Sequence, residues 1–254
     1  MLNSVSFRSL SILRLDARGG VEIIGAVDSQ SLEKPMDAIR PEMIPIPAVR
    51  RLSLYLRQLD GFKRSDRKTI SSKQLGESLG LTDAQVRKDL AYFGQFGHPG
   101  IGYSVDELIG RLRHILGTDR TWNVLLVGAG NLGRALAAYN GFDAKGFNLV
   151  AVFDADPSKI GKSHGGFLIQ SLADLTTTVD QKQIRLAIIA VPAEAAQEVV
   201  DQLIAAGIRG ILNFAPTSIT VPPNVALNAV DLAVQLEQLS FQVNFSLTQT
   251  IEGE

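Results

Sequence analysis

The chain has 254 residues, no cysteine, 45% hydrophobic residues and a formal net charge of −1. Without cysteine it can form no disulfide, thiol nucleophile or thiolate metal site, and we expect a cytoplasmic protein. No apolar run is long enough to predict a membrane-spanning helix, and the first residues do not have the pattern of a secretory signal.

Charge is distributed unevenly along the chain. Residues 44–120 hold 13 Lys and Arg against 8 Asp and Glu, whereas residues 121–254 hold 7 against 12. The two halves therefore carry net charges of +5 and −5. This asymmetry indicates two domains with different roles, and it favours contact with a polyanion for the front domain.

The first part of the chain is predicted to comprise an extension and a helical domain. Residues 1–43 show no sustained periodicity and end in a proline-spaced segment, so we expect a poorly ordered extension. Residues 44–118 are expected to form a winged helix-turn-helix domain. Its first helix follows Pro47 and has an apolar stripe made of Val49, Leu52, Leu56 and Leu59.

Residues 72–93 predict two short helices joined by a turn that contains glycine. The second helix starts with Thr82 and Gln85 at the spacing of a capping box. One face of it is small and basic, which suits the major groove of DNA. The candidate DNA contacts on this face are Gln85, Arg87, Lys88 and Tyr92. The alternative is a three-helix bundle whose basic face is only solvated.

The stretch FGHPGIGYSV, residues 96–105, predicts a glycine-rich hairpin, or wing, after the helix-turn-helix. His98 on this wing is a further candidate DNA contact. A second capping-box spacing, Ser104 with Glu107, opens the last helix of the domain. A short polar linker follows it, and the domain is expected to end near residue 118.

Residues 119–254 alternate strands with helices, which predicts a parallel sheet wrapped by helices. Between the first strand and helix lies a G-x-G-x-x-G turn, typical of a site that holds a pyrophosphate on a helix N-terminus. Asp154 ends the next strand, 21 residues after Gly133, and favours NAD(H) by accepting from both ribose hydroxyls. The candidate turn residues are Gly128, Ala129, Gly130, Asn131, Leu132 and Gly133.

A dehydrogenase would also need a proton donor or acceptor and a substrate domain. His98 and His114 fall in the front domain, and His164 follows the second strand of the back domain. Residues 119–254 already hold the whole nucleotide-binding fold. We therefore predict no catalytic residue and no metal site, and we expect the cofactor to act as a signal rather than a reagent.

Several strings in both domains are similar to one known family. The most specific are QVRKDLAYFGQFG, VLLVGAGNLGRALA, FDADPSKIG and ILNFAP. Over residues 45–245 the chain resembles the Rex family of redox-sensing transcriptional repressors. The resemblance implies an α/β protein with an N-terminal winged helix, a C-terminal Rossmann domain and a homodimer that swaps its C-terminal helices. It further implies repression of genes by operator binding, with release from DNA by NADH as the NADH/NAD+ ratio rises.

The resemblance also implies roles for individual residues. The strand ends beside the nicotinamide would be Val191, Pro192, Asn213 and Pro216. Arg57, Tyr139 and Asp231 match a switch in which the Asp changes partners between the Tyr and the Arg. The chain departs from the family at Pro99, where many members carry a basic residue, and at Leu232, where some carry an aromatic one.

Two functions of other classes stay open at this point. One is a small NAD-dependent oxidoreductase with an appended basic domain, which turnover of carbonyl compounds with NADH would reveal. The other is an NAD-binding scaffold that binds a protein. Strongly salt-dependent binding to a DNA duplex would argue against that scaffold.

Overall fold

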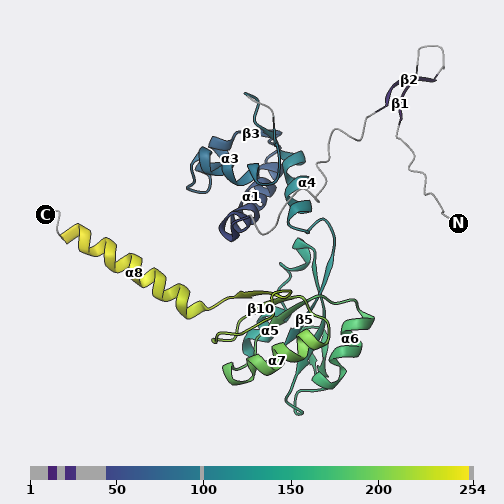
Figure 1. Ribbon diagram of the computed structural model, residues 1–254, viewed down its shortest axis with the longest axis vertical. Helices are drawn as coiled ribbons and strands as arrows, with labels where there is room; N and C mark the ends of the chain where they lie inside the picture. Colours follow the sequence, from purple (N-terminus) through teal and green to yellow (C-terminus); the bar gives the residue numbers. More distant parts are fainter. Residues whose placement is uncertain (1–10, 16–20, 27–43, 98–99, 252–254) are drawn as a thin grey trace. The chain divides into compact units, whose positions relative to one another are not determined.

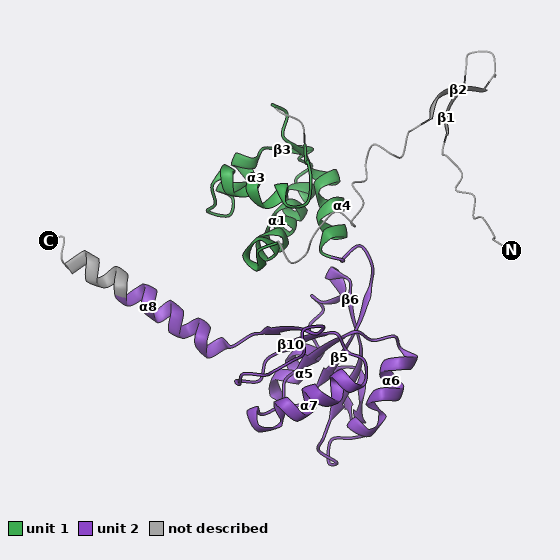
Figure 2. Ribbon diagram, in the orientation of Figure 1, with its two compact units in different colours: residues 1–116 green, residues 117–254 purple. Residues whose placement is uncertain are grey.

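The structure is a computed structural model, and it describes residues 11–15, 21–26, 44–97 and 100–251 (Figure 1). The chain divides into two compact units, Met1–Leu116 and Gly117–Glu254 (Figure 2). This division falls two residues before the boundary that the sequence suggests. Among the helices of the described residues, none combines the length and apolarity that crossing a membrane requires.

Two strands lie within the segment that we expected to be a poorly ordered extension. β1 (Ser11–Leu15) and β2 (Val21–Ala26) pair antiparallel, with a register shift between Ile12 and Leu13. Neither strand was predicted, because neither SILRL nor VEIIGA alternates strictly between apolar and polar residues.

Unit 1 is the helical unit, and its helices pack with a two-stranded antiparallel ladder of β3 and β4. After β1 and β2, its elements are α1 (Ile46–Arg64), β3 (Thr69–Ile70), α2 (Ser72–Glu77), α3 (Asp83–Ala91), β4 (Tyr103–Ser104) and α4 (Val105–Ile115). The two helices of the predicted helix-turn-helix are present as α2 and α3, and β4 lies within the segment predicted to be the wing. β4 pairs with β3, a strand before α2 that the sequence analysis did not predict. Val49, assigned to the apolar stripe of α1, is instead 38% exposed, and Tyr55 takes a core position beside Leu52 and Leu59.

Each predicted capping box, at the start of α3 and of α4, forms only one of its two hydrogen bonds. The hydroxyls of Thr82 and Ser104 each accept a hydrogen bond from the backbone N–H three residues later. The reciprocal side chains turn elsewhere: Gln85 donates to Asp89, and Glu107 pairs with the arginine one turn later. Both helix starts still satisfy one of their free N–H groups.

Unit 2 is a parallel α/β unit, as predicted. Its strands are β5 (Trp122–Val127), β6 (Phe147–Asp154), β7 (Ser163–His164), β8 (Phe167–Ser171), β9 (Leu186–Ile189), β10 (Gly210–Asn213) and β11 (Ala226–Ala229). Its α-helices are α5 (Asn131–Ala137), α6 (Leu175–Gln181), α7 (Ala193–Ala205) and α8 (Leu232–Ile251). The strand order is β11-β10-β9-β5-β6-β8-β7, and every pairing is parallel except that of β7 with β8.

This strand order is that of a Rossmann sheet, with β5 as its first strand. β5 lies between β6 on one side and β9 on the other, so the chain reverses its direction of winding there. Alternation along β5 sends Leu125 and Val127 into the core with α6 and α7, whereas Val124 and Leu126 pack on the face of α5. Ligands of open parallel sheets bind beyond the carboxyl ends of strands at such a reversal.

Candidate nucleotide-binding site and DNA-binding surface

The turn after β5 requires glycine at Gly128. Its φ is +102°, and a Cβ added there would overlap the carbonyl oxygen of Ala190, the residue that follows β9. The Gly128 N–H donates to the Phe153 carbonyl at 2.8 Å. The turn therefore packs closely against the residue that follows β9 and is hydrogen-bonded to β6, at the point where the sheet reverses its winding.

The other two glycines of the motif have different roles. A Cβ on Gly133 would overlap the Gly128 carbonyl oxygen, so the first turn of α5 packs directly on the glycine turn. A Cβ on Gly130, the N-cap of α5, would meet nothing within 4 Å. Open space beside a helix start is what a pyrophosphate needs to approach the backbone N–H groups, so this turn fits a dinucleotide.

Asp154 joins the end of β6 to the glycine turn and is 7% exposed. Its Oδ2 accepts from the backbone N–H of Ala129 at 2.7 Å, and its Oδ1 accepts from that of Asp156 at 2.9 Å. Burial raises the pKa of Asp154. The two backbone hydrogen bonds and the Lys159 ammonium lower it by more than burial raises it, so the pKa lies below its usual range. The carboxylate is therefore charged and faces the turn that would hold the cofactor.

Lys159 is a residue of this site that the sequence did not single out. Its Nζ lies 3.0 Å from Oδ2 of Asp154 and 3.8 Å from Oδ2 of Asp156. The cation lies five residues after Asp154 and not directly after it. Two carboxylates two residues apart at the end of a strand, Asp154 and Asp156, are a signal that favours a neighbouring cation such as Lys159.

The residues assigned to the nicotinamide end lie after β9 and β10, which are neighbouring parallel strands. Val191 is half-buried and adjoins the Cβ position of Gly128, while Pro192 is exposed at the start of α7. Pro216 is exposed in the loop after β10. These three residues thus follow two adjacent strand ends, and Val191 lies beside the glycine turn.

Asn213 has a different environment from the one expected of a cofactor contact. It is 1% exposed, its Oδ1 accepts from the Ala215 N–H at 2.7 Å, and its Nδ2 donates to the Ala215 and Thr217 carbonyls at 3.2 and 3.3 Å. The Asn213 amide is thus hydrogen-bonded to the backbone of the loop that carries Pro216. Asn213 therefore acts on this loop and not through an amide hydrogen pointed at a ligand.

The predicted DNA-reading face of α3 is partly as expected. Arg87 and Lys88 are exposed, and Tyr92, at the end of the helix, is 36% exposed. Arg87 pairs with Asp83 one turn earlier at 2.6 Å and donates to the Ser72 hydroxyl at 3.1 Å. Both contacts lie at the exposed surface, where they contribute little stability and are readily exchanged for a phosphate or a base edge.

Two of the predicted DNA contacts differ from the rest. The Gln85 amide points back into the unit and donates to Oδ1 of Asp89 at 2.7 Å, so it is not free to read a base edge. Gln85 had been assigned to the outward face from its helical position alone. His98 lies outside the described residues.

One of the three switch residues belongs to unit 1 and the other two belong to unit 2. Arg57 is exposed on α1 of unit 1. In unit 2, Tyr139 is 59% exposed and lies edge-on to Phe142 with ring centroids 5.0 Å apart. Asp231 caps α8, accepting from the Ala233 N–H at 2.9 Å and from the next N–H at 3.2 Å. A cap that binds only backbone N–H groups can be exchanged for another partner at modest cost.

Comparison with family models matches both units. Residues 43–91 match the model described as "Putative DNA-binding protein N-terminus", and residues 119–217 match the one described as "CoA binding domain". The first match contains α1 to α3, and the second contains the glycine turn and Asp154.

The matches with similar curated proteins cover nearly the full length of those proteins. The Redox-sensing transcriptional repressor Rex of Carboxydothermus hydrogenoformans is 48% identical over 200 residues, which is 79% of this chain and 96% of that protein. The protein of the same name from Syntrophomonas wolfei is 47% identical over 198 residues, 78% of this chain and 94% of that one.

Solved structures agree with these relatives. The crystal structure of RSP in complex with β-NAD+ and operator DNA has a TM-score of 0.77 and 38% sequence identity, and the match covers 84% of this chain and 98% of RSP. The structure of RSP in complex with β-NADH has a TM-score of 0.73 and 36% identity, covering 82% and 99%. RSP is itself described as a Rex-family repressor.

Proposed function

The chain belongs to the Rex family of redox-sensing transcriptional repressors, and from this premise we propose that it represses transcription from operator DNA according to the NADH/NAD+ ratio. The observation that carries the proposal is the union, in one chain, of a recognition helix exposing Arg87 and Lys88 with a glycine turn closed by Asp154. A second observation is that one relative, RSP, is known with operator DNA and with either form of the cofactor.

On the DNA side, we assign Arg87, Lys88 and Tyr92 to the major groove. The two cations would bind guanine edges or phosphates, and the tyrosine at the helix end would contact the backbone. A homodimer would place two such helices in successive grooves of a pseudo-palindromic operator.

On the cofactor side, we assign the pyrophosphate to the N–H groups at the start of α5 and the adenosine ribose to Asp154. A carboxylate offers about four acceptor positions, and three are used here, one of them by Lys159. Lys159 is 38% exposed, so rotation of its side chain would free that position for a hydroxyl.

Sensing has to come from the other end of the cofactor, because the adenosine contacts are the same in both redox states. The oxidised nicotinamide ring carries a positive charge and the reduced ring does not. Val191, Pro192 and the loop held by Asn213 are the residues that we assign to this difference. A ligand shifts a two-state equilibrium only through its different affinity for the two states, so the response follows the ratio of the two forms.

We propose that Asp231 exchanges partners between Tyr139 and Arg57 as the cofactor changes. Support comes from the exposure of Tyr139 and Arg57 and from the N-cap role of the half-buried Asp231, which adjoins α8 and would couple the exchange to that helix. No catalytic residue is assigned in this proposal. A cytoplasmic location is part of it, since the operator is there.

Replacing Asp154 with alanine should weaken NADH binding by about 10- to 100-fold, the loss expected for one or two hydrogen bonds to a charged group. Operator binding in NAD+-free buffer should be retained, because unit 1 carries the DNA contacts. Titration of NADH into the variant, followed by its fluorescence, measures the first effect, and a gel shift measures the second.

Asp156→Ala is the matched control for this variant. Asp156 is a partly exposed carboxylate two residues away that accepts from the Ser158 N–H at 2.9 Å. Its loss should leave NADH binding within about twofold of the parent, as is usual for a surface substitution. Unchanged NADH binding by Asp154→Ala would remove the ribose assignment.

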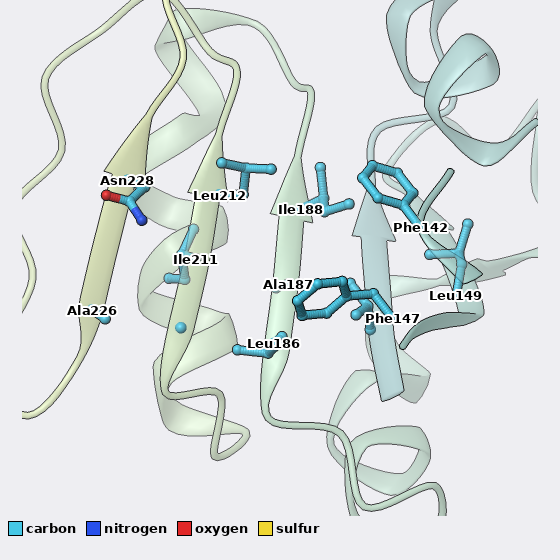
Figure 3. Close-up of a pocket in the computed structure, with 12 residues that line it drawn as sticks. Phe142, Phe147, Leu149, Leu186, Ala187, Ile188, Ile211, Leu212, Ala226 and Asn228 are labelled. Carbon is cyan, nitrogen blue, oxygen red and sulfur yellow. The ribbon is translucent and has the colours of Figure 1, made fainter. Parts of the chain in front are cut away.

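We further propose that the C-terminal helix is exchanged between two copies of this chain. The exposed apolar stripe of α8 consists of Leu232, Leu236, Leu239 and Val243. In the same unit, a cavity of about 360 Å³ opens over β9, β10 and β11, and Figure 3 shows its lining residues. Its lining residues Ile188 and Leu212 belong to the apolar cluster that also contains residues of α5. Its walls are almost wholly apolar and include Phe142, Phe147 and Leu212. An α8 from the partner would fill this groove and cover both apolar surfaces at once.

Replacing Leu239 with arginine should therefore raise the dimer dissociation constant by about 30-fold or more, the effect of losing one central interface residue. Light scattering across a dilution series measures it. Gln238→Arg adds the same charge beside the stripe and should leave the dimer intact. Equal association of both variants would exclude this helix from the interface.

A further inference from the structure

The recognition helix α3 is held from inside by a buried carboxylate. Asp89 is 1% exposed and lies among the side chains of α1 and α3. Arg51 on α1 grips it with two parallel hydrogen bonds, Nε to Oδ2 at 2.5 Å and Nη2 to Oδ1 at 2.8 Å. The Tyr55 hydroxyl donates to Oδ2 at 2.7 Å, and Gln85 donates to Oδ1 at 2.7 Å. We call Arg51, Tyr55, Gln85 and Asp89 the Asp89 cluster.

The three hydrogen-bonding partners of Asp89 compensate for the burial of its negative charge. Burial raises the pKa of Asp89, but the hydrogen bonds from Arg51, Tyr55 and Gln85 outweigh burial and hold it below its usual range. Burial and the hydrogen bond to Asp89 raise the pKa of Tyr55 far above its usual value, so its proton stays in place. The cluster therefore keeps one protonation pattern across the neutral range, and it is a fixed joint and not a titrating switch.

The geometry of the joint determines how α3 is oriented. A guanidinium that meets a carboxylate in a two-bond fork fixes both distance and rotation, whereas an ammonium would act as a point charge. The two donors from α1 meet Asp89 from a single helix, while Gln85 ties Asp89 to the preceding turn of its own helix. Asp89 directly follows Lys88 and is two residues from Arg87, so a rotation of α3 would move both exposed cations.

Stability does not explain why such a cluster is present. Burying a charged pair costs nearly as much in desolvation as it gains, and well-packed apolar residues at the same positions are often as stable. The directional hydrogen bonds from α1 to Asp89 instead hold α3 in a single orientation. Contacts to phosphates tolerate small displacements of a helix, whereas hydrogen bonds to base edges do not.

We propose that the Asp89 cluster positions the recognition helix and so determines how well the protein distinguishes its operator from other sequences. Arg51, Tyr55 and Gln85 are thus specificity-positioning residues that act through Arg87 and Lys88 and do not read bases. The proposal rests on the proposed function, because it presupposes that α3 enters the major groove.

The test compares the full-length parent protein with Arg51→Lys and Gln85→Met. Arg51→Lys keeps the charge and removes the fork, while Gln85→Met keeps the side-chain size and removes the donor. For each protein, affinities are measured for the operator, for a series with one base pair substituted at a time, and for an unrelated duplex, all at one salt concentration. Thermal unfolding is recorded in parallel.

In both variants, the difference in affinity between the operator and each singly substituted duplex should shrink at every base pair that α3 reads. The total decrease should be about tenfold, which is within the range for one misplaced base contact. Binding to the unrelated duplex should change by less than about twofold, because phosphate contacts carry it. Both variants should lose discrimination at the same positions. Arg113→Lys, which alters the partly exposed 3.1 Å pair of α4 with Asp60 on α1, is the matched control and should keep the parent's profile.

Two results would overturn the proposal. One is loss of discrimination at a single base pair in Gln85→Met with Arg51→Lys unchanged, which would make Gln85 a direct base reader. The other is an equal loss of affinity for all duplexes in step with a lower melting temperature, which would make the cluster merely structural. A parent protein that does not prefer the operator would instead contradict the proposed function itself.

Discussion

Gly133→Ala should abolish detectable NADH binding and lower the free energy of unfolding of unit 2 by about 3 kcal/mol or more, a size typical of severe overpacking. The reason is that the new Cβ would overlap the Gly128 carbonyl oxygen, which is backbone and cannot rotate away. α5 would have to move off the turn, and its N–H groups would leave the pyrophosphate position. Fluorescence titration with NADH and chemical unfolding measure the two effects.

Gly110→Ala is the matched control for this substitution. Gly110 lies within α4, where an added Cβ meets nothing within 4 Å, so alanine should stabilise unit 1 by about 0.5–1 kcal/mol through its better helix propensity. NADH binding should be unaffected. If Gly133→Ala bound NADH as well as Gly110→Ala does, the close packing of α5 on the turn would not be needed for the site.

Replacing both Arg87 and Lys88 with alanine should weaken operator binding by about 100-fold or more, from about 1–3 kcal/mol for each lost base or phosphate contact. NADH affinity should stay at the parent value, because neither residue belongs to unit 2. The fold should also survive, since both side chains are exposed and the Arg87 pair with Asp83 is a surface contact.

The control for this double variant removes the same charge elsewhere in unit 1. Lys63 and Arg64 are exposed in the last turn of α1, so their replacement tests whether net charge alone explains binding. Operator affinity should then fall much less than in the α3 variant. Equal losses in both double variants would mean that unit 1 binds DNA through its general positive charge and that α3 has no special role.

The sequence was sufficient for the features that depend on spacing. The alternation of strands and helices predicted the Rossmann sheet, and three glycines with Asp154 predicted where its ligand turn lies, because backbone constraints are local. The helix-turn-helix followed from caps and apolar stripes in the same way. Residue types at fixed intervals carry this information, and the resemblance to a known family added the partners.

Other features depend on contacts between distant residues, and the sequence did not reveal them. Gln85 was assigned to DNA from its helical position, yet its amide binds Asp89. A signal was present, since Asp89 lies three residues after the core residue Val86 and so has to be buried with a partner. Nothing in the spacing indicated that this partner would be Arg51, which lies 38 residues earlier. Likewise, the sequence did not indicate that the Asn213 amide binds the Ala215 and Thr217 backbone.

The most direct test of the central claim is a gel shift with an AT-rich palindromic operator probe, with NAD+ present and NADH added in increasing amounts. The account predicts a complex that micromolar NADH releases and that excess NAD+ restores, because both forms compete for one site and favour different states. A tight complex that does not respond to NADH would contradict it and would leave a DNA-binding protein whose Rossmann unit senses another ligand.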